Sequence, residues 1–365
     1  MHPDFQHLMH RATQLTQSGD LSAATAAIQA ALRNGLAAAP ARQDDADVID
    51  VEAWEVPDTA QASSAAPHVS GDAAQSAPKP AAAGDTFTAG SFRNSSGQRA
   101  YKLYVPPNPD GTPRPLVVML HGCTQDADDF AAGTAMNAAA REKGFHVLYP
   151  VQSSDANPQK CWNWFKHNHQ QPGRGEPSIL AGMTREVIAA HNIDPTRVYV
   201  AGLSAGGAMA AILAGAYPEL YAAAGVHSGL AAGAATDLPS ALSAMKGVGL
   251  KPAAPAGNGV PVIVFHGDRD ATVNPANAGN VIAASVGPNA RVETVRVAGA
   301  GSMRDSTQHV YRDAAGNIVA ERWDVHGAGH AWAGGSEQGS YTDRTGPDAT
   351  AEMLRFFFAR TSRAQ

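Results

Sequence analysis

This 365-residue sequence has few cysteines, a small net charge and no long apolar run. Its two cysteines are too few for a disulfide-rich scaffold or for a zinc site built on cysteine. The formal net charge of −6 gives no reason to expect nucleic-acid binding. No apolar run reaches about 18 residues, so no membrane-spanning helix is expected. The first residues also lack the basic start and apolar core of a signal peptide.

The composition divides the chain into three parts. Residues 1–36 contain two short amphipathic patterns around a break at residues 18–20, which predict a helical hairpin. A hairpin of this size buries little surface by itself, so we expect it to dock on the main domain, on another copy or on a partner. Residues 37–84 are rich in Ala, Pro and Ser and predict a disordered linker. Residues 85–362 carry the pattern of one large folded domain.

Short apolar runs alternate with helical patterns along this domain. The continuous apolar runs lie at residues 115–120, 145–149, 197–201 and 260–265, and they predict buried strands of a central parallel sheet. Residues 100–106 alternate instead, which predicts a strand with one buried face. Helices are expected at 130–143, 179–191 and 208–216. A hairpin is expected over residues 308–325 and a closing helix over 349–360. This alternation indicates an α/β fold, with a mostly parallel sheet flanked by helices.

The domain is expected to be organised around residues 197–216. An apolar run leads into Gly202-Leu203-Ser204-Ala205-Gly206, a G-x-S-x-G pattern, and then into a helix-favouring stretch. That order is the context of a nucleophile elbow, a sharp turn that exposes a serine hydroxyl. The glycines are required because side chains there would collide with the neighbouring strand and helix. Ser204 is therefore the candidate nucleophile, and an incidental serine in a Gly-rich turn is the alternative.

A serine nucleophile needs a base to take its proton and an acid to hold that base. In α/β hydrolases the chain order is Ser, acid, His, each on a loop after a strand. Asp270 lies far enough beyond the run at residues 260–265 for its loop to curl towards the site, so we predict it as the acid. Asp268 is closer to the strand end and is expected to cap the turn or pair with Arg269.

The predicted base is His330, which follows the strand at residues 318–325 in a glycine-flanked loop. Those glycines allow the loop to bring an imidazole near Ser204. His326 lies closer to the strand end, where a histidine is more often packed in the core. The two histidines could share a metal ion, but no third ligand is evident, so no metal site is expected.

Backbone N–H groups able to stabilise an oxyanion are expected at two places. The Ala205 N–H follows the nucleophile directly, at the start of a helix. The Cys123 N–H lies in the loop after the strand at residues 115–120, where Gly122 allows close approach of the backbone. In the same loop His121 is expected to fix the loop rather than to act as a base.

Aromatic residues cluster around the second cysteine, in Cys161-Trp-Asn-Trp-Phe165. Trp162 and Trp164, with Trp332 beside the predicted base, could line a substrate pocket or pack in the core against the sheet. The sequence leaves both interpretations open. A disulfide from Cys123 to Cys161 would join residues 161–165, the aromatic loop, to residues 121–125, the oxyanion loop. Such a bridge would favour an oxidising compartment. Two free thiols are the alternative.

Five motifs in this order resemble the polyhydroxybutyrate (PHB)-depolymerase-type esterases, which are α/β hydrolases similar to feruloyl and acetylxylan esterases. They are His121-Gly-Cys-Thr-Gln125, Cys161-Trp-Asn-Trp-Phe165, Gly202-Leu-Ser-Ala-Gly206, His266-Gly-Asp-Arg-Asp-Ala-Thr-Val273 and Gly329-His-Ala-Trp332. The resemblance covers about residues 87–360. It implies hydrolysis of carboxylic esters without a cofactor, and it supports the roles given above to Ser204, Asp270, His330, Cys123 and Ala205.

The resemblance implies hydroxyalkanoate polyester or its oligomers as the first substrate, and feruloyl or acetyl esters of plant cell walls as the second. Many family members are secreted, which implies an extracellular location. With no visible signal peptide, a cytoplasmic, granule-associated location is the alternative. No polymer-adsorption domain is expected after residues 349–360, in contrast to the polymer-degrading members that this chain resembles. The rival from another class is an inactive hydrolase fold whose N-terminal hairpin binds polymer granules or a protein partner.

Overall fold

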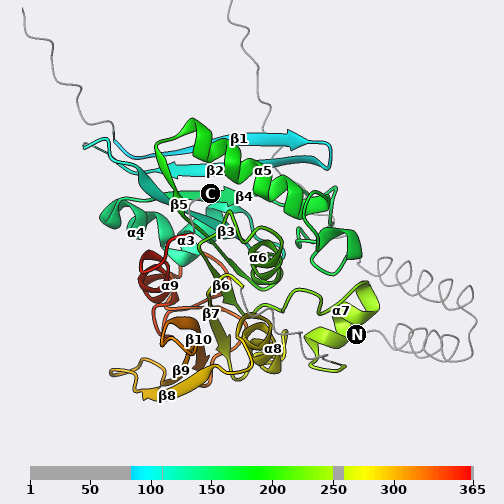
Figure 1. The fold of residues 1–365 in the computed structure, drawn as a ribbon, viewed down its shortest axis with the longest axis vertical. Helices are drawn as coiled ribbons and strands as arrows, with labels where there is room; N and C mark the ends of the chain where they lie inside the picture. Colours follow the sequence, from blue (N-terminus) through cyan, green and yellow to red (C-terminus); the bar gives the residue numbers. More distant parts are fainter. Residues whose placement is uncertain (1–83, 109, 250–258, 363–365) are drawn as a thin grey trace, which may run out of the picture. The chain divides into compact units, whose positions relative to one another are not determined.

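A computed structural model describes residues 84–108, 110–249 and 259–362 (Figure 1). The hairpin predicted at residues 1–36 lies outside the described residues, as does all but the last residue of the predicted linker at residues 37–84. Both therefore stay predictions.

The largest sheet has ten strands, in the order β1-β2-β4-β3-β5-β6-β7-β10-β9-β8 (Figure 1). The strands are β1 (Thr86–Asn94), β2 (Gly97–Val105), β3 (Arg114–Leu120), β4 (His146–Pro150), β5 (Ile193–Leu203), β6 (Ala223–His227), β7 (Val262–Gly267), β8 (Arg291–Val297), β9 (Ser306–Arg312) and β10 (Ile318–Val325). Neighbours from β4 to β10 are parallel. Antiparallel strands complete both edges. The predicted mostly parallel sheet is confirmed.

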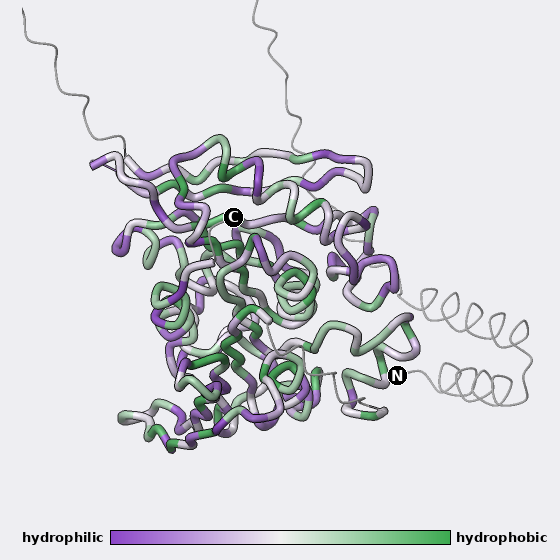
Figure 2. Tube along the Cα trace, viewed as in Figure 1, coloured by the Kyte–Doolittle hydropathy of each residue, from purple (hydrophilic) through white to green (hydrophobic). Residues whose placement is uncertain are grey.

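Helices cover both faces of this sheet. They are α3 (Ala127–Thr134), α4 (Met136–Lys143), α5 (Gly175–Ala190), α6 (Ala205–Ala216), α7 (Leu238–Met245), α8 (Ala276–Ser285) and α9 (Ala349–Phe358). Alternate residues of β3 enter different cores: Leu116, Val118 and Leu120 pack with α5, α6 and α8, whereas Val117 and Met119 pack with α3, α4 and α9. Figure 2 shows the central strands as the most hydrophobic part of the domain.

One predicted helix is interrupted. The stretch at residues 130–143 forms the end of α3 and the whole of α4, because Ala135 between them takes a left-handed backbone with φ of 52°. Its N–H bonds to the Ala132 carbonyl, which closes the first helix. Strands β1, β6 and β8 were not predicted from the sequence.

The parallel strands end together at one edge of the sheet, where α/β proteins place their ligand sites. Leu120 pairs with Gly202, and His227 pairs with both Leu203 and Phe265, so β3, β5, β6 and β7 end in register. The loops that follow carry the candidate residues. Among the described helices, none combines the length and the apolar character needed to cross a bilayer.

Candidate active site

Ser204 occupies a strained turn between β5 and α6. Its backbone has φ 58° and ψ −119°, a conformation that costs a non-glycine residue roughly 1–3 kcal/mol. Its N–H donates to the His227 carbonyl at 2.8 Å. A Cβ on Gly206 would lie 2.0 Å from the Leu120 oxygen, and one on Gly202 would lie 2.4 Å from the Gly206 carbonyl carbon. The expected steric need for both glycines is confirmed.

Asp270 and His330 form a hydrogen-bonded pair. Their Oδ2 and Nδ1 atoms lie 2.7 Å apart, with the carboxylate fully buried and the imidazole 12% exposed. The other carboxylate oxygen accepts the N–H groups of Thr272 at 2.9 Å and Val273 at 2.8 Å. With Nδ1–H donating to Asp270, the Nε2 atom of His330 has a free lone pair for a proton.

The carboxylate of Asp270 stays ionised. Burial by itself would raise the pKa of Asp270, but hydrogen bonds from His266 and His330 and from the Val273 N–H more than offset this, so its pKa lies well below the usual range. An ionised acid can hold an imidazole in one tautomer and stabilise its protonated form.

The contact between the serine and the imidazole is not made in this structure. Among the hydrogen bonds of the described residues, none joins Ser204 to His330. Candidate bases often tighten onto their partner only when substrate is bound. The roles of Ser204, Asp270 and His330 therefore stay predictions.

The two predicted oxyanion donors are available. Within the described ranges, neither the Cys123 N–H nor the Ala205 N–H donates to another residue. A Cβ on Gly122 would lie 3.7 Å from Ser204 Cβ, so the loop before Cys123 approaches the serine closely. The side chain of Gln125, which the sequence did not single out, accepts the Gly122 N–H at 2.9 Å and fixes this approach.

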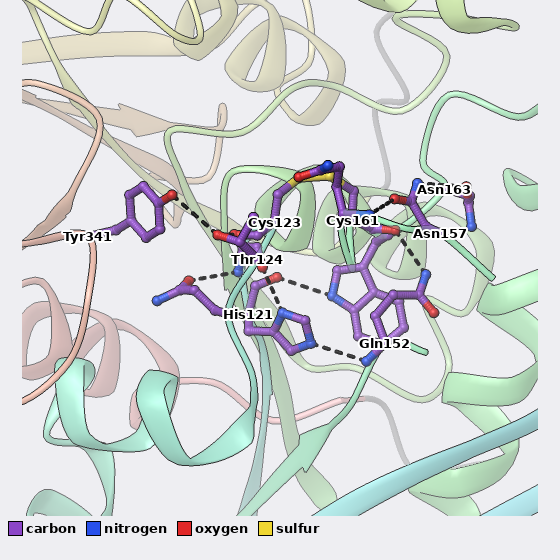
Figure 3. The surroundings of a disulfide bond; sticks show 12 residues. His121, Cys123, Thr124, Gln152, Asn157, Cys161, Asn163 and Tyr341 are labelled. Carbon is purple, nitrogen blue, oxygen red and sulfur yellow. Dashed lines mark hydrogen bonds between the residues drawn. A yellow bond between two sulfur atoms is a disulfide. The ribbon is translucent and has the colours of Figure 1, made fainter. Parts of the chain in front are cut away.

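A disulfide joins Cys123 to Cys161, so the alternative of two free thiols does not hold (Figure 3). His121 is buried, its Nδ1–H donates to the Gly122 carbonyl at 2.7 Å, and its Nε2 accepts the Gln152 N–H at 3.1 Å. Burial lowers its pKa and keeps it neutral. The expectation that His121 fixes the loop is confirmed by these two bonds.

The aromatic loop is held by a buried carboxylate that the sequence did not reveal. Glu176 accepts the N–H of Asn163 at 2.7 Å and its side-chain amide at 2.8 Å. It also pairs with Arg99 at 3.1 Å. Burial would raise the pKa of Glu176, but hydrogen bonds from His169, Gln152 and Asn163 lower it to about 2. The carboxylate thus stays charged and fastens the loop to α5.

The three tryptophans assigned to a pocket are buried. Trp162, Trp164 and Trp332 are 0%, 5% and 1% exposed. Trp162 donates its Nε1–H to the His121 carbonyl at 3.1 Å, and Trp332 donates to Thr350 at 3.1 Å. These rings fill the cores on the two faces of the sheet, which supports the packing interpretation rather than a wall open to substrate.

His227, at the end of β6, is a second residue that the sequence did not reveal. Its carbonyl accepts the Ser204 N–H, and its Nε2 accepts the Ala333 N–H at 2.9 Å. The ring stacks between Phe265, at 5.7 Å, and Trp332, at 5.1 Å. Burial is the main reason that the pKa of His227 falls to about 3. A neutral histidine therefore connects the elbow to the loop that carries His330.

Two sequence expectations near the predicted acid and base need correction. Asp268 pairs with His326 at 3.1 Å and accepts the Gly327 N–H at 2.7 Å, rather than pairing with Arg269. The His326 side chain is 39% exposed and bonds to Thr307 at 2.9 Å, so it is not a core histidine. Among the described residues, no group of three His, Cys, Asp or Glu side chains is suited to hold a metal ion.

A strained serine at an elbow and a buried Asp–His pair, at the carboxyl edge of a mostly parallel sheet, define the α/β-hydrolase class. Residues 99–309 match the family model described as Esterase PHB depolymerase, and the chain belongs to this family. The resemblance inferred from the sequence motifs is thereby confirmed.

Individual relatives agree with this membership. The chain is 35% identical over 236 residues to poly(3-hydroxyalkanoate) depolymerase C of Paucimonas lemoignei, covering 61% of this chain and 56% of the relative. It is 34% identical over 140 residues to feruloyl esterase B of Thermothelomyces thermophilus, covering 38% of this chain and 47% of the relative. The chain thus spans about half the length of these curated relatives.

A solved structure supports the fold. The acetyl xylan esterase from Aspergillus awamori superimposes with a TM-score of 0.54 at 22% identity, covering 64% of this chain and 89% of that chain.

Proposed function

We propose that the protein is a serine esterase that hydrolyses carboxylic esters through an acyl-enzyme at Ser204. The observation that carries this proposal is the 2.7 Å hydrogen bond between His330 and the buried Asp270. That bond leaves Nε2 as the proton acceptor, as a serine-activating base requires. The strained elbow at Ser204 and the membership of the esterase family support it independently.

The proposed reaction has two halves. His330 takes the Ser204 proton, and the alkoxide attacks the ester carbonyl. The Cys123 and Ala205 N–H groups donate to the oxyanion, each lowering the barrier by roughly 2.7–4 kcal/mol. His330 then gives its proton to the departing alcohol, which leaves the acyl group on Ser204. A water molecule, deprotonated by His330, then attacks this ester. The bond from the acyl group to Ser204 breaks, His330 returns the proton to the Ser204 oxygen, and the acid is released.

Hydroxyalkanoate polyester or its oligomers are the first proposed substrate, because the match to the relative named as a poly(3-hydroxyalkanoate) depolymerase is long, at 236 residues. Feruloyl or acetyl esters are the second, from the match to a feruloyl esterase. The Cys123–Cys161 bridge favours an oxidising, extracellular compartment. The alternative of a granule- or partner-binding protein without activity depends on the hairpin at residues 1–36, which lies outside the described residues.

The test compares purified wild type with Ser204→Ala on hydroxybutyrate trimer and on methyl ferulate, with products identified by mass. We expect the wild type to cleave the trimer faster, and Ser204→Ala to lose at least about 10³-fold in kcat. Ser243→Ala, on the exposed face of α7, serves as the matched serine control and should keep the wild-type rate. Hydrolysis by Ser204→Ala at the wild-type rate would refute the proposal.

A further inference from the structure

Tyr341 is an exposed aromatic residue held in a strained conformation. Its φ of 52° is in the left-handed region, which a bulky residue rarely adopts. Yet the residue is 47% exposed, so its ring does not gain a buried core position in return. Such strain persists only where the surroundings determine the backbone, and it concentrates at functional sites.

Hydrogen bonds on two sides hold the loop that carries this residue. The Tyr341 carbonyl accepts the Trp332 N–H at 2.7 Å, which ties it to the loop of the predicted base. The preceding residue, Ser340, donates its N–H and hydroxyl to Asp129 at 2.7 and 2.6 Å. The Ser340 carbonyl also accepts from Gln125 at 3.2 Å, the same side chain that holds the oxyanion loop.

The ring extends to the oxyanion loop. Its hydroxyl lies 3.2 Å from Thr124 Oγ1. In Figure 3 the Tyr341 side chain points towards Thr124. Since the Thr124 hydroxyl already donates to the Cys123 carbonyl at 2.6 Å, Tyr341 is the donor in this contact. Thr124 follows the predicted oxyanion donor directly, and the preceding Gly122 lies against Ser204. An exposed aromatic ring therefore stands beside the loop that would receive the oxyanion.

We propose that the ring of Tyr341 is a specificity-determining wall of the ester site. It packs against the apolar part of the substrate that extends beyond the reacting carbonyl, and so favours longer-chain esters over acetyl esters. This inference rests on the proposed esterase function. The physical reason is that the ring is already fixed and half-exposed. Apolar substrate atoms can therefore cover it without a loss of side-chain entropy on binding.

The test measures kcat/KM for p-nitrophenyl hexanoate and p-nitrophenyl acetate. Tyr341→Asn removes the ring while keeping a residue that tolerates a left-handed backbone. We expect the hexanoate-to-acetate ratio to fall about tenfold, mainly through KM for hexanoate, which is the scale of discrimination by apolar contacts. Tyr341→Phe keeps the ring and loses only the bond to Thr124, so the ratio should stay within about twofold of wild type.

Val292→Asn, at an exposed apolar position on β8, is the control and should leave the ratio unchanged. A wild-type ratio in Tyr341→Asn would overturn the inference, and so would an equal loss in Tyr341→Phe. If Tyr341→Asn fails to fold, Tyr341→Gly makes the same test without backbone strain. A wild type that cleaves neither ester would instead refute the proposed function.

Discussion

The two sides of the candidate site are held in different ways. On the oxyanion side, residues 121–125 are fastened to residues 161–165 by a disulfide, by a buried tryptophan and by the network of Glu176. On the base side, residues 266–273 and 326–333 are joined by hydrogen bonds and by the pair of Asp268 and His326, and neither segment carries a cysteine. Because the sequence has only two cysteines, no second covalent bridge can form there.

This difference suits the two chemical tasks. Donors to an oxyanion act best when their positions are fixed before the charge develops, and the disulfide at Cys123 holds the residue whose N–H group is proposed as one of them. The proposed base, His330, must take a proton from one group and give it to another. Its loop is held by polar contacts, which include the Ala333 N–H that donates to the neutral His227. We therefore expect substitutions on the base side to lower kcat most, and substitutions on the oxyanion side to lower the free energy of unfolding most.

The largest expected effect is that of Asp270→Asn. The amide keeps the shape of the side chain but no longer selects the imidazole tautomer, so kcat should fall by about 10⁴-fold. Steady-state kinetics with p-nitrophenyl butyrate measures the loss, and the thermal midpoint checks that the fold is intact. A loss smaller than tenfold would show that Asp270 does not hold the base.

Breaking the disulfide should act on stability. The bridged residues are 38 positions apart, for which loop-closure entropy predicts a stabilisation of about 3–4 kcal/mol. Cys161→Ala and Cys123→Ala form a matched pair, since each removes the bridge and each keeps the N–H of residue 123. Urea unfolding should show the same large loss for both. Unequal losses in kcat would mean that the Cys123 side chain itself takes part in the reaction.

The buried histidines predict loss of stability in acid. The pKa values of His146 and His227 fall to about 4 and about 3, so the folded protein keeps both neutral while the unfolded chain protonates below about pH 6.5. The stability that they contribute should therefore be constant above that pH and fall as pH drops towards 4, by about 3 kcal/mol for each histidine. Glu176, whose pKa is about 2, adds a further loss only as pH falls below about 4.5.

Urea unfolding of the wild type and of His227→Gln at pH 7.0, 5.5 and 4.5 measures this effect. The variant should be less stable at neutral pH but should lose less on acidification. Parallel curves for the two proteins would show that His227 is not the group that titrates.

The smallest expected effect is that of Asp268→Asn. The pair that Asp268 forms with His326 is about 40% exposed, and exposed pairs contribute less than about 1 kcal/mol. The amide oxygen can still accept the Gly327 N–H. We expect at most a few-fold change in kcat/KM, in contrast to Asp270→Asn two residues away. Equal losses of kcat/KM in Asp268→Asn and Asp270→Asn would show that the two carboxylates do not have different roles.

Local patterns were enough to predict the parallel sheet, the sharp turn at Ser204 and the two loops that carry Asp270 and His330. The G-x-S-x-G turn could be anticipated because the motif itself is local, although the backbone of Leu120, on the neighbouring strand, supplies much of the steric reason for its glycines. Strand β6 was missed because Ala223–His227 consists largely of small residues, whose burial comes from both neighbouring strands rather than from their own hydrophobicity. The break at Ala135 falls two residues after Gly133, on an alanine, which ordinarily favours helix, so no local pattern places the break there.

Local sequence patterns could not identify the residues that hold the loops of the candidate site. Glu176 and His227 act through partners that are distant in the chain, and a charged residue on a helix or a histidine at a strand end has many ordinary explanations. Likewise Asp268 finds its partner in His326, 58 residues away, instead of in the adjacent Arg269. Polar pairing across loops is decided by the register of β7 against β10, which no local pattern encodes.

The most direct test of the central claim is covalent labelling with an organophosphate, located by peptide mass spectrometry. The account predicts a single adduct, on the peptide that carries Ser204, with no labelling of Ser204→Ala and much slower labelling of His330→Ala. A wild type that hydrolyses esters while Ser204 stays unmodified, or an equal yield of adduct in Ser204→Ala, would contradict it.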